Sequence, residues 1–169
     1  MYYGTKRKVF ISYHHRGDQG GFDRFTQLFA EQYEIFYDNS LDGRIRSDDP
    51  EYVNREIREE HIVGSSVTIV LCGAESWKRK YVDWEIHSTL YHEHALLGIA
   101  LPTAVRGNQG GIIVPNRLHD NIQNGFAYWL SAWPSDPNAL RAAIEAAINL
   151  SQETTKIRND RPKMGRNLS

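Results

Sequence analysis

The sequence predicts an α/β fold, an open, doubly wound parallel sheet of about five strands flanked by helices. Short apolar runs alternate with stretches of helical periodicity, and the connections between them are mostly short. This alternation is typical of parallel sheets. The run at residues 65–73 is apolar and β-branched almost throughout, which suits a central strand buried on both faces. The chain has 169 residues, enough for one domain with a proper core.

The first part of the chain predicts three strands and two helices. Apolar runs predict strands, and apolar residues at intervals of three or four predict helices. Asp49 and Pro50 together favour a helix start, since aspartate caps an N-terminus and proline suits the first helical position. In chain order, we expect a strand at 9–13, a helix from 22 to about 33, a strand at 34–37, a helix ending at Gly64, and a strand at 65–73.

The second part of the chain continues the alternation. Asp136 and Pro137 repeat the cap-plus-proline start, followed by a helical stripe of apolar residues. In order, we expect a helix at 77–93, a strand at 95–102, a loop-rich stretch at 103–124, a strand at 126–133 and a last helix from 137. Residues 1–151 form the predicted domain, and the polar, basic residues 152–169 a mobile tail.

Composition excludes several classes of protein. The net charge is −1, so no global field favours nucleic acid or an anionic membrane. The single cysteine, Cys72, excludes a disulfide framework and lies where a core thiol is expected. No stretch approaches the roughly 20 apolar residues of a membrane span. The histidines lack the spacing that places two imidazoles on one metal, so no metal site is predicted. We expect a cytoplasmic protein without a nucleic-acid or membrane partner.

A binding site is expected at the carboxyl ends of the strands, where doubly wound sheets hold their ligands. The segments at this edge are 14–21, 38–49, 73–81 and 102–111. The phosphate-binding patterns GxxxxGK[ST] and GxGxxG are absent from the sequence, and Ser12 lacks the GxSxG setting of a serine hydrolase. These observations leave the chemistry of the site open.

Glu85 is unusual within the predicted helix at 77–93. It lies at the margin of the apolar stripe, one and two turns after Tyr81 and Trp77. A carboxylate beside aromatic residues at the rim of a buried face is costly to desolvate unless something interacts with it. Glu85 is therefore either a surface residue that reaches solvent or a working group of the site.

Several segments together resemble TIR domains. KVFISYHH is similar to their opening strand, and the stretch from Tyr37 to Gly73 is similar to their second strand, BB loop, helix and central strand. SWKRKYVDWEI resembles their W-x-x-x-E segment, with Tyr81 at the aromatic position and Glu85 at the glutamate. The combination resembles the bacterial branch of short, stand-alone TIR-like proteins that includes the TIR subunits of Thoeris antiphage defence systems.

The resemblance implies a flavodoxin-like sheet and cleavage of the nicotinamide–ribose bond of NAD, which is the substrate and not a cofactor. Thoeris-type members make a cyclic ADP-ribose isomer that activates a downstream effector. Glu85 is the implied catalytic residue. The implied substrate-binding residues, which also follow from the strand-edge argument or the aromatic segment, are Ser12, Tyr13, Asp38, Ser40, Asp48, Trp77 and Tyr81. Tyr81 in place of the usual tryptophan, and the bulk of Trp84, change the expected pocket shape.

Two alternatives remain open. Some members of the resembled family hydrolyse NAD to ADP-ribose instead of cyclising it. Other TIR domains act as non-enzymatic interaction modules, in which case Leu41–Ile45 of the BB loop would be the contact and Glu85 a structural residue. Self-association on activation is expected in either case. If the protein is an enzyme whose active site is completed by a neighbouring chain, its activity is expected to depend on protein concentration.

Overall fold

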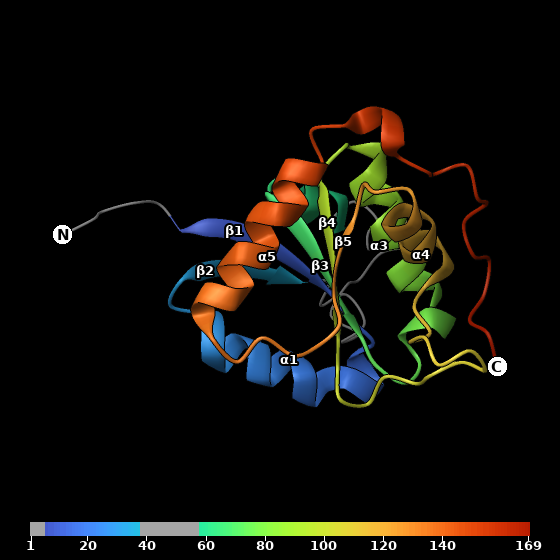
Figure 1. Cartoon of the computed structure of the whole chain (residues 1–169), viewed down its shortest axis with the longest axis horizontal. Helices are drawn as coiled ribbons and strands as arrows, with labels where there is room; N and C mark the ends of the chain where they lie inside the picture. Colours follow the sequence, from blue (N-terminus) through green and yellow to red (C-terminus); the bar gives the residue numbers. More distant parts are fainter. Residues whose placement is uncertain (1–5, 38–57) are drawn as a thin grey trace, which may run out of the picture.

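The computed structural model describes residues 6–37 and 58–169, which build one parallel sheet with helices on both faces (Figure 1). The strand order is β2-β1-β3-β4-β5, and every neighbouring pair is parallel. The strands are β1 (Arg7–Ser12), β2 (Tyr33–Tyr37), β3 (Val67–Cys72), β4 (Ala95–Ala100) and β5 (Tyr128–Leu130). This is the flavodoxin-like order, so the predicted fold class is confirmed.

Strand β3 lies at the centre of the sheet, and all six of its residues are buried. It pairs with β1 through Ile11 and Ile69, and with β4 through Val67 and Ala95. Its side chains alternate between the two faces, because successive residues of a strand point in opposite directions. The continuous apolar run thus has the central position predicted for it.

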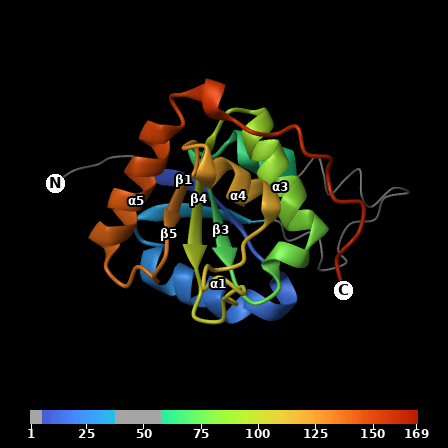
Figure 2. The same cartoon turned by 45° about the vertical axis from the view of Figure 1, so that its right-hand side comes forward.

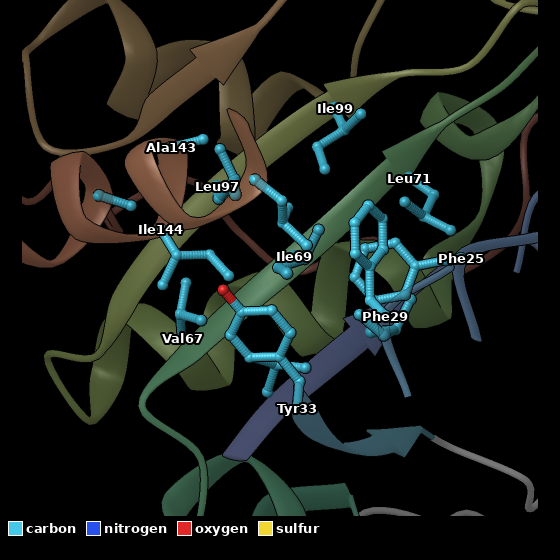
Figure 3. Close-up of a cluster of buried hydrophobic side chains, with 14 of the residues drawn as sticks. Phe25, Phe29, Tyr33, Val67, Ile69, Leu71, Leu97, Ile99, Ala143 and Ile144 are labelled. Carbon is cyan, nitrogen blue, oxygen red and sulfur yellow. The ribbon is translucent and has the colours of Figure 1, made fainter. Parts of the chain in front are cut away.

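Helices α1 (His15–Phe29) and α5 (Pro137–Leu150) cover one face of the sheet (Figure 1). Figure 3 shows Phe25 and Phe29 of α1 beside Ile69 and Leu71 of β3, with Ile144 of α5 farther along the same face. Each fully buried side chain of this size contributes about 1.5–3 kcal/mol to folding. Asp136 caps α5 by accepting a hydrogen bond from the Asn138 N–H (2.9 Å), as predicted.

Helices α3 (Lys80–Tyr91) and α4 (Asn116–Gln123) cover the other face (Figure 2). Val82 and Ile86 of α3 and Leu118 of α4 pack against Val70 and Cys72 of β3. The Thr89 hydroxyl lies 2.7 Å from that of Thr68 and 2.8 Å from the Glu85 carbonyl oxygen, to which it donates. This buried polar link fixes the helix that carries Glu85 against the sheet.

Several elements differ from the sequence predictions in their extent. Helix α1 begins at His15, earlier than predicted, and its backbone departs from helical geometry at Asp18. Helix α4 lies inside the stretch predicted to be loop-rich, and β5 is shorter than predicted. Trp77 lies in a separate 3-10 turn, η2 (Ser76–Lys78), before α3. Residues 58–63 are helical as predicted, whereas the predicted helix start at Asp49 lies outside the described residues.

The segment after α5 is held against the domain and is not the mobile tail that its composition predicted. It makes a short 3-10 turn, η3 (Thr154–Lys156), and then runs past α4 and α3 as an extended strap, residues 157–168 (Figure 2). The Trp84 Nε1–H donates to the carbonyl oxygen of Met164 (2.7 Å), and the Asn159 amide donates to that of His87 (3.1 Å). Hydrogen bonds to and from the strap therefore hold it in place, together with Ile157, which packs against the apolar cluster beneath α3 and α4.

Within the described residues, no helix combines the length and the apolar character needed to cross a membrane.

Candidate functional site

A pocket of about 520 Å³ opens at the carboxyl end of β1, where ligands bind in this type of sheet. Its volume lies within the range of small-molecule sites, roughly 300–1,000 Å³. Three segments far apart in sequence line it: the start of α1, the start of α3 and the strap. The lining residues are Tyr13, His14, His15, Arg16, Gln19, Arg79, Tyr81, Val82, Glu85 and Asn167.

Glu85 lies on the wall of this pocket and is only 2% exposed. Helix α3 buries its Val82 and Ile86 against the sheet, which turns Glu85 inward beside them. The interpretation of Glu85 as a surface residue that reaches solvent is therefore wrong. A carboxylate removed from bulk water interacts more strongly with any positive charge placed beside it. The pocket can therefore stabilise a cation that forms next to Glu85.

Two arginines line the same pocket and give it positive charge. Arg79 precedes α3 and donates to a Glu75 carboxylate oxygen (2.8 Å), and Arg16 lies in the first turn of α1. His14 lies beside them, and its pKa is lowered by burial and by the positive charge of Arg79. Guanidinium groups recognise phosphate oxygens through paired hydrogen bonds. One pocket thus combines groups for anionic phosphates with a buried carboxylate for a cation.

Two aromatic residues at the pocket are already engaged within the protein. The Tyr13 ring stacks on the rings of His15 (4.3 Å between centroids) and Phe22 (4.5 Å), and its hydroxyl donates to Gln19 (3.1 Å). Tyr13 therefore holds the start of α1 in place and meets the pocket at its edge. Tyr81 packs edge-on against Trp84 with 5.4 Å between ring centroids, and it too lines the pocket.

The structure brings together three of the eight residues predicted for the site: Tyr13, Tyr81 and Glu85. Ser12 is fully buried at the end of β1 and does not line the pocket. Trp77 also lies apart from it, and its Nε1–H donates to the Ala74 carbonyl oxygen (3.1 Å). The other three, Asp38, Ser40 and Asp48, lie outside the described residues, as does the BB-loop contact at Leu41–Ile45.

Seven of the ten lining residues are not among those predicted from sequence. Six of them are His14, His15, Arg16, Gln19, Arg79 and Val82. Of these, all but Val82 fall within the segments 14–21 and 73–81, which are predicted to lie at the binding edge of the sheet. If every basic or amide side chain in these two segments had been treated as a ligand contact, these five residues would have been identified. Asn167 belongs to the predicted mobile tail, and nothing in the sequence pointed to it.

A second buried acid, Asp18, lies next to the pocket wall. It is 5% exposed, and its carboxyl group packs so closely on Gly73 that a Cβ there would collide with it. Burial, together with the negative charge of Glu75, raises the pKa of Asp18 to about 6. Asp18 lines a smaller pocket of about 260 Å³ with Arg24 and Trp133, and it does not line the pocket of Glu85.

No group of three or more histidine, cysteine, aspartate or glutamate side chains that could hold a metal ion is found among residues 6–37 and 58–169.

Comparisons with known proteins give one family match. The model of the TIR-like domain of the Thoeris protein ThsB matches residues 10–106, more than half of the chain. No curated protein sequence matches the chain. Among solved structures, the chain is similar to the TIR domains of the activated Roq1 resistosome directly recognising the pathogen effector XopQ. That likeness has 12% identity and a TM-score of 0.43, and it covers 88% of this chain and 85% of the other.

Proposed function

Because the chain belongs to the TIR-like domain family of the Thoeris protein ThsB, we propose that it cleaves NAD and makes a cyclic ADP-ribose isomer as a signal molecule. The family match supports a TIR-domain role in antiphage defence. The observation that carries the enzymatic proposal is Glu85, a carboxylate 2% exposed on a pocket that Arg16 and Arg79 also line. NAD carries a pyrophosphate and a cationic nicotinamide ring, which match these two kinds of charge.

In the first step, the bond between ribose C1′ and the nicotinamide nitrogen breaks. The electron pair leaves with nicotinamide, which becomes neutral, and the ribose becomes oxocarbenium-like. The Glu85 carboxylate stabilises this positive charge, and its burial strengthens the effect. Arg16 and Arg79 bind the pyrophosphate and hold the reacting ribose beside Glu85.

The second step determines the product. Attack on C1′ by a nucleophile of the adenosine end, either an adenine-ring nitrogen or a ribose hydroxyl that then loses its proton, closes the ring and gives a cyclic ADP-ribose isomer. Attack of water, followed by loss of a proton, gives ADP-ribose. Ring closure requires that water be kept from the cation. The two products differ in mass by one water, so mass spectrometry separates the cyclase from the hydrolase.

The proposal is tested by incubating concentrated protein with NAD and separating the products by chromatography and mass spectrometry. Glu85→Gln keeps the size of the side chain and removes its charge, so we expect nicotinamide release to fall at least a hundredfold with the fold intact. Glu93→Gln is the matched control, because Glu93 is exposed just after the same helix. Equal turnover by Glu85→Gln and wild type would refute the catalytic assignment.

Self-association is the second part of the proposal. A TIR pocket completed by a neighbouring chain requires contact between copies, so we expect the activity per molecule to rise with protein concentration. A constant specific activity over a wide dilution series would contradict this part. If the protein associates but releases no nicotinamide at any concentration, the non-enzymatic interaction module replaces the enzyme proposal.

A further inference from the structure

The strap is attached to α4 by a pair of hydrogen bonds. Asn121, fully buried in α4, donates from its Nδ2 to the Arg158 carbonyl oxygen (2.8 Å) and accepts from the Arg158 N–H at its Oδ1 (2.9 Å). This two-bond pairing between a side-chain amide and a backbone amide fixes both the direction and the register of the strap where it begins.

A buried arginine then fixes the middle of the strap between α4 and α3. Arg117 is fully buried and donates to the carbonyl oxygens of Arg161 (2.7 Å) and Pro162 (3.0 Å). The same guanidinium group pairs with Asp83 of α3 (2.9 Å), whose other carboxylate oxygen accepts from the Met164 N–H (2.8 Å). Every contact is a hydrogen bond to a charged group, the stronger kind in proteins.

The end of the strap reaches the start of α3. The Leu168 N–H donates to the Lys78 carbonyl oxygen (2.9 Å), and the Asn167 Oδ1 accepts from the Lys80 N–H (2.9 Å). The first N–H groups of a helix have no partner within the helix. The residue in the N-cap position, Arg79, supplies no side-chain cap. Asn167 therefore supplies a cap from a distant part of the chain, and it does so on the wall of the pocket.

We propose that Asn167 is a substrate-binding residue whose side-chain Nδ2 donates a hydrogen bond to the pyrophosphate of the bound dinucleotide. This inference rests on the proposed function. Because the Lys80 N–H occupies Oδ1, the NH₂ of Asn167 remains as donor, and no described residue accepts from it. Asn167 and Arg79 lie together at the start of α3, whereas Glu85 lies five residues farther along, about 7.5 Å by helix rise. The pyrophosphate would lie beside Asn167 and Arg79, and the reacting ribose beside Glu85.

Two substitutions separate the donor from the cap. Asn167→Asp keeps the oxygen that accepts from Lys80, and a negative charge at a helix N-terminus is favourable, so α3 stays capped. It replaces the NH₂ donor by a charged oxygen that repels phosphate. Asn167→Ala removes both groups. If Asn167 only caps the helix, Asn167→Asp should behave like wild type and Asn167→Ala should be the more damaging change. If Asn167 binds phosphate, Asn167→Asp should be the more damaging change.

The experiment measures NAD turnover and, by calorimetry, the binding of ADP-ribose, which has the pyrophosphate but no bond to cleave. For Asn167→Ala we expect KM for NAD and Kd for ADP-ribose to rise roughly ten- to a hundredfold, the usual weight of a hydrogen bond to a charged group. We expect a larger rise for Asn167→Asp and little change in kcat for either, because the pyrophosphate is bound equally before and during bond cleavage. Asn149→Asp, at an exposed position of α5, is the matched control.

The outcomes separate this inference from the function on which it rests. If wild type cleaves NAD and Asn167→Asp has the KM and Kd of wild type, the inference is wrong and the proposed function stands. If wild type binds ADP-ribose without cleaving NAD, the calorimetry still decides the role of Asn167. If wild type neither binds ADP-ribose nor cleaves NAD, both are overturned.

Discussion

The structure predicts a large loss of stability for Arg117→Met. Arg117 is fully buried, and its guanidinium group donates both to Asp83 (2.9 and 3.3 Å) and to acceptors on the strap. Methionine keeps an unbranched apolar chain of similar length but removes every donor. The Asp83 side chain, 4% exposed, would keep its hydrogen bond from the Met164 N–H and lose its charge partner.

The magnitude follows from that stranded charge. Removing one partner of a buried ion pair costs about 3–5 kcal/mol. In a domain of this size each kcal/mol lowers Tm by about 2–4 °C, so the melting temperature should fall by roughly 6–20 °C. The double variant Asp83→Leu/Arg117→Met should lose less than Arg117→Met alone, because it leaves no unpaired buried charge.

Urea unfolding and calorimetry measure the loss of global stability, and hydrogen exchange measures the local opening of the strap. Released from Arg117, the strap amides of Met164 and Leu168 should exchange faster in the variant than in wild type. Arg161→Met is the matched control, since Arg161 pairs with Asp120 at the surface (3.0 Å), where an ion pair is worth about 1 kcal/mol or less. Equal losses of stability in the two variants would refute the argument from burial.

Two further predictions concern buried groups near the site. The pKa of Asp18 is about 6 in the folded protein, above its ordinary value of 3.8. Between pH 3.8 and pH 6, folding is therefore accompanied by protonation of Asp18. This protonation stabilises the fold fully below pH 4, and the stabilisation is lost as the pH rises through 6. Asp18→Asn should therefore gain about 1–3 kcal/mol over wild type between pH 4 and pH 7.5 in urea unfolding, and a difference that does not vary with pH would count against it. Cys72 is fully buried, and burial raises the pKa of its thiol, so native protein should react with an alkylating reagent at least a hundredfold more slowly than protein in urea; comparable rates would contradict its placement in the core.

The parts of the fold that sequence predicts well are those set by apolar pattern and local capping. The run at β3 and the Asp136 cap of α5 follow from residue types alone. Helix α4 was missed because its buried face carries Arg117 and Asn121, which hide the apolar periodicity of a helix. The early start of α1 was missed because its glycines disfavour a helix by about 1 kcal/mol each relative to alanine, a cost that tertiary packing outweighs here.

The site was predictable only in part, for a related reason. Glu85 and Tyr81 came from a local motif, and the strand-edge rule located the segments of Arg16 and Arg79. Ser12 does not line this pocket although it ends β1, because a residue at the end of a strand can be buried within the protein as easily as it can meet a ligand. Asn167 reaches the pocket because Arg117, Asn121 and Trp84 donate hydrogen bonds to carbonyl oxygens of the strap's backbone. Every residue has such a carbonyl oxygen, so the amino-acid sequence of the strap does not reveal these bonds.

The strap also affects when during folding the pocket becomes complete. Its bonds to α3 join residues 81 positions apart for Met164 and Asp83, and 87 apart for Asn167 and Lys80. Such distant contacts cost loop-closure entropy, and they become favourable only after α3 and α4, on which the strap lies, have formed. A chain that has built its sheet but not seated residues 157–168 carries Glu85 without a finished pocket. Under the proposed function, a half-folded chain would already carry Glu85 but, without Asn167 in place, would bind NAD more weakly than the completed molecule.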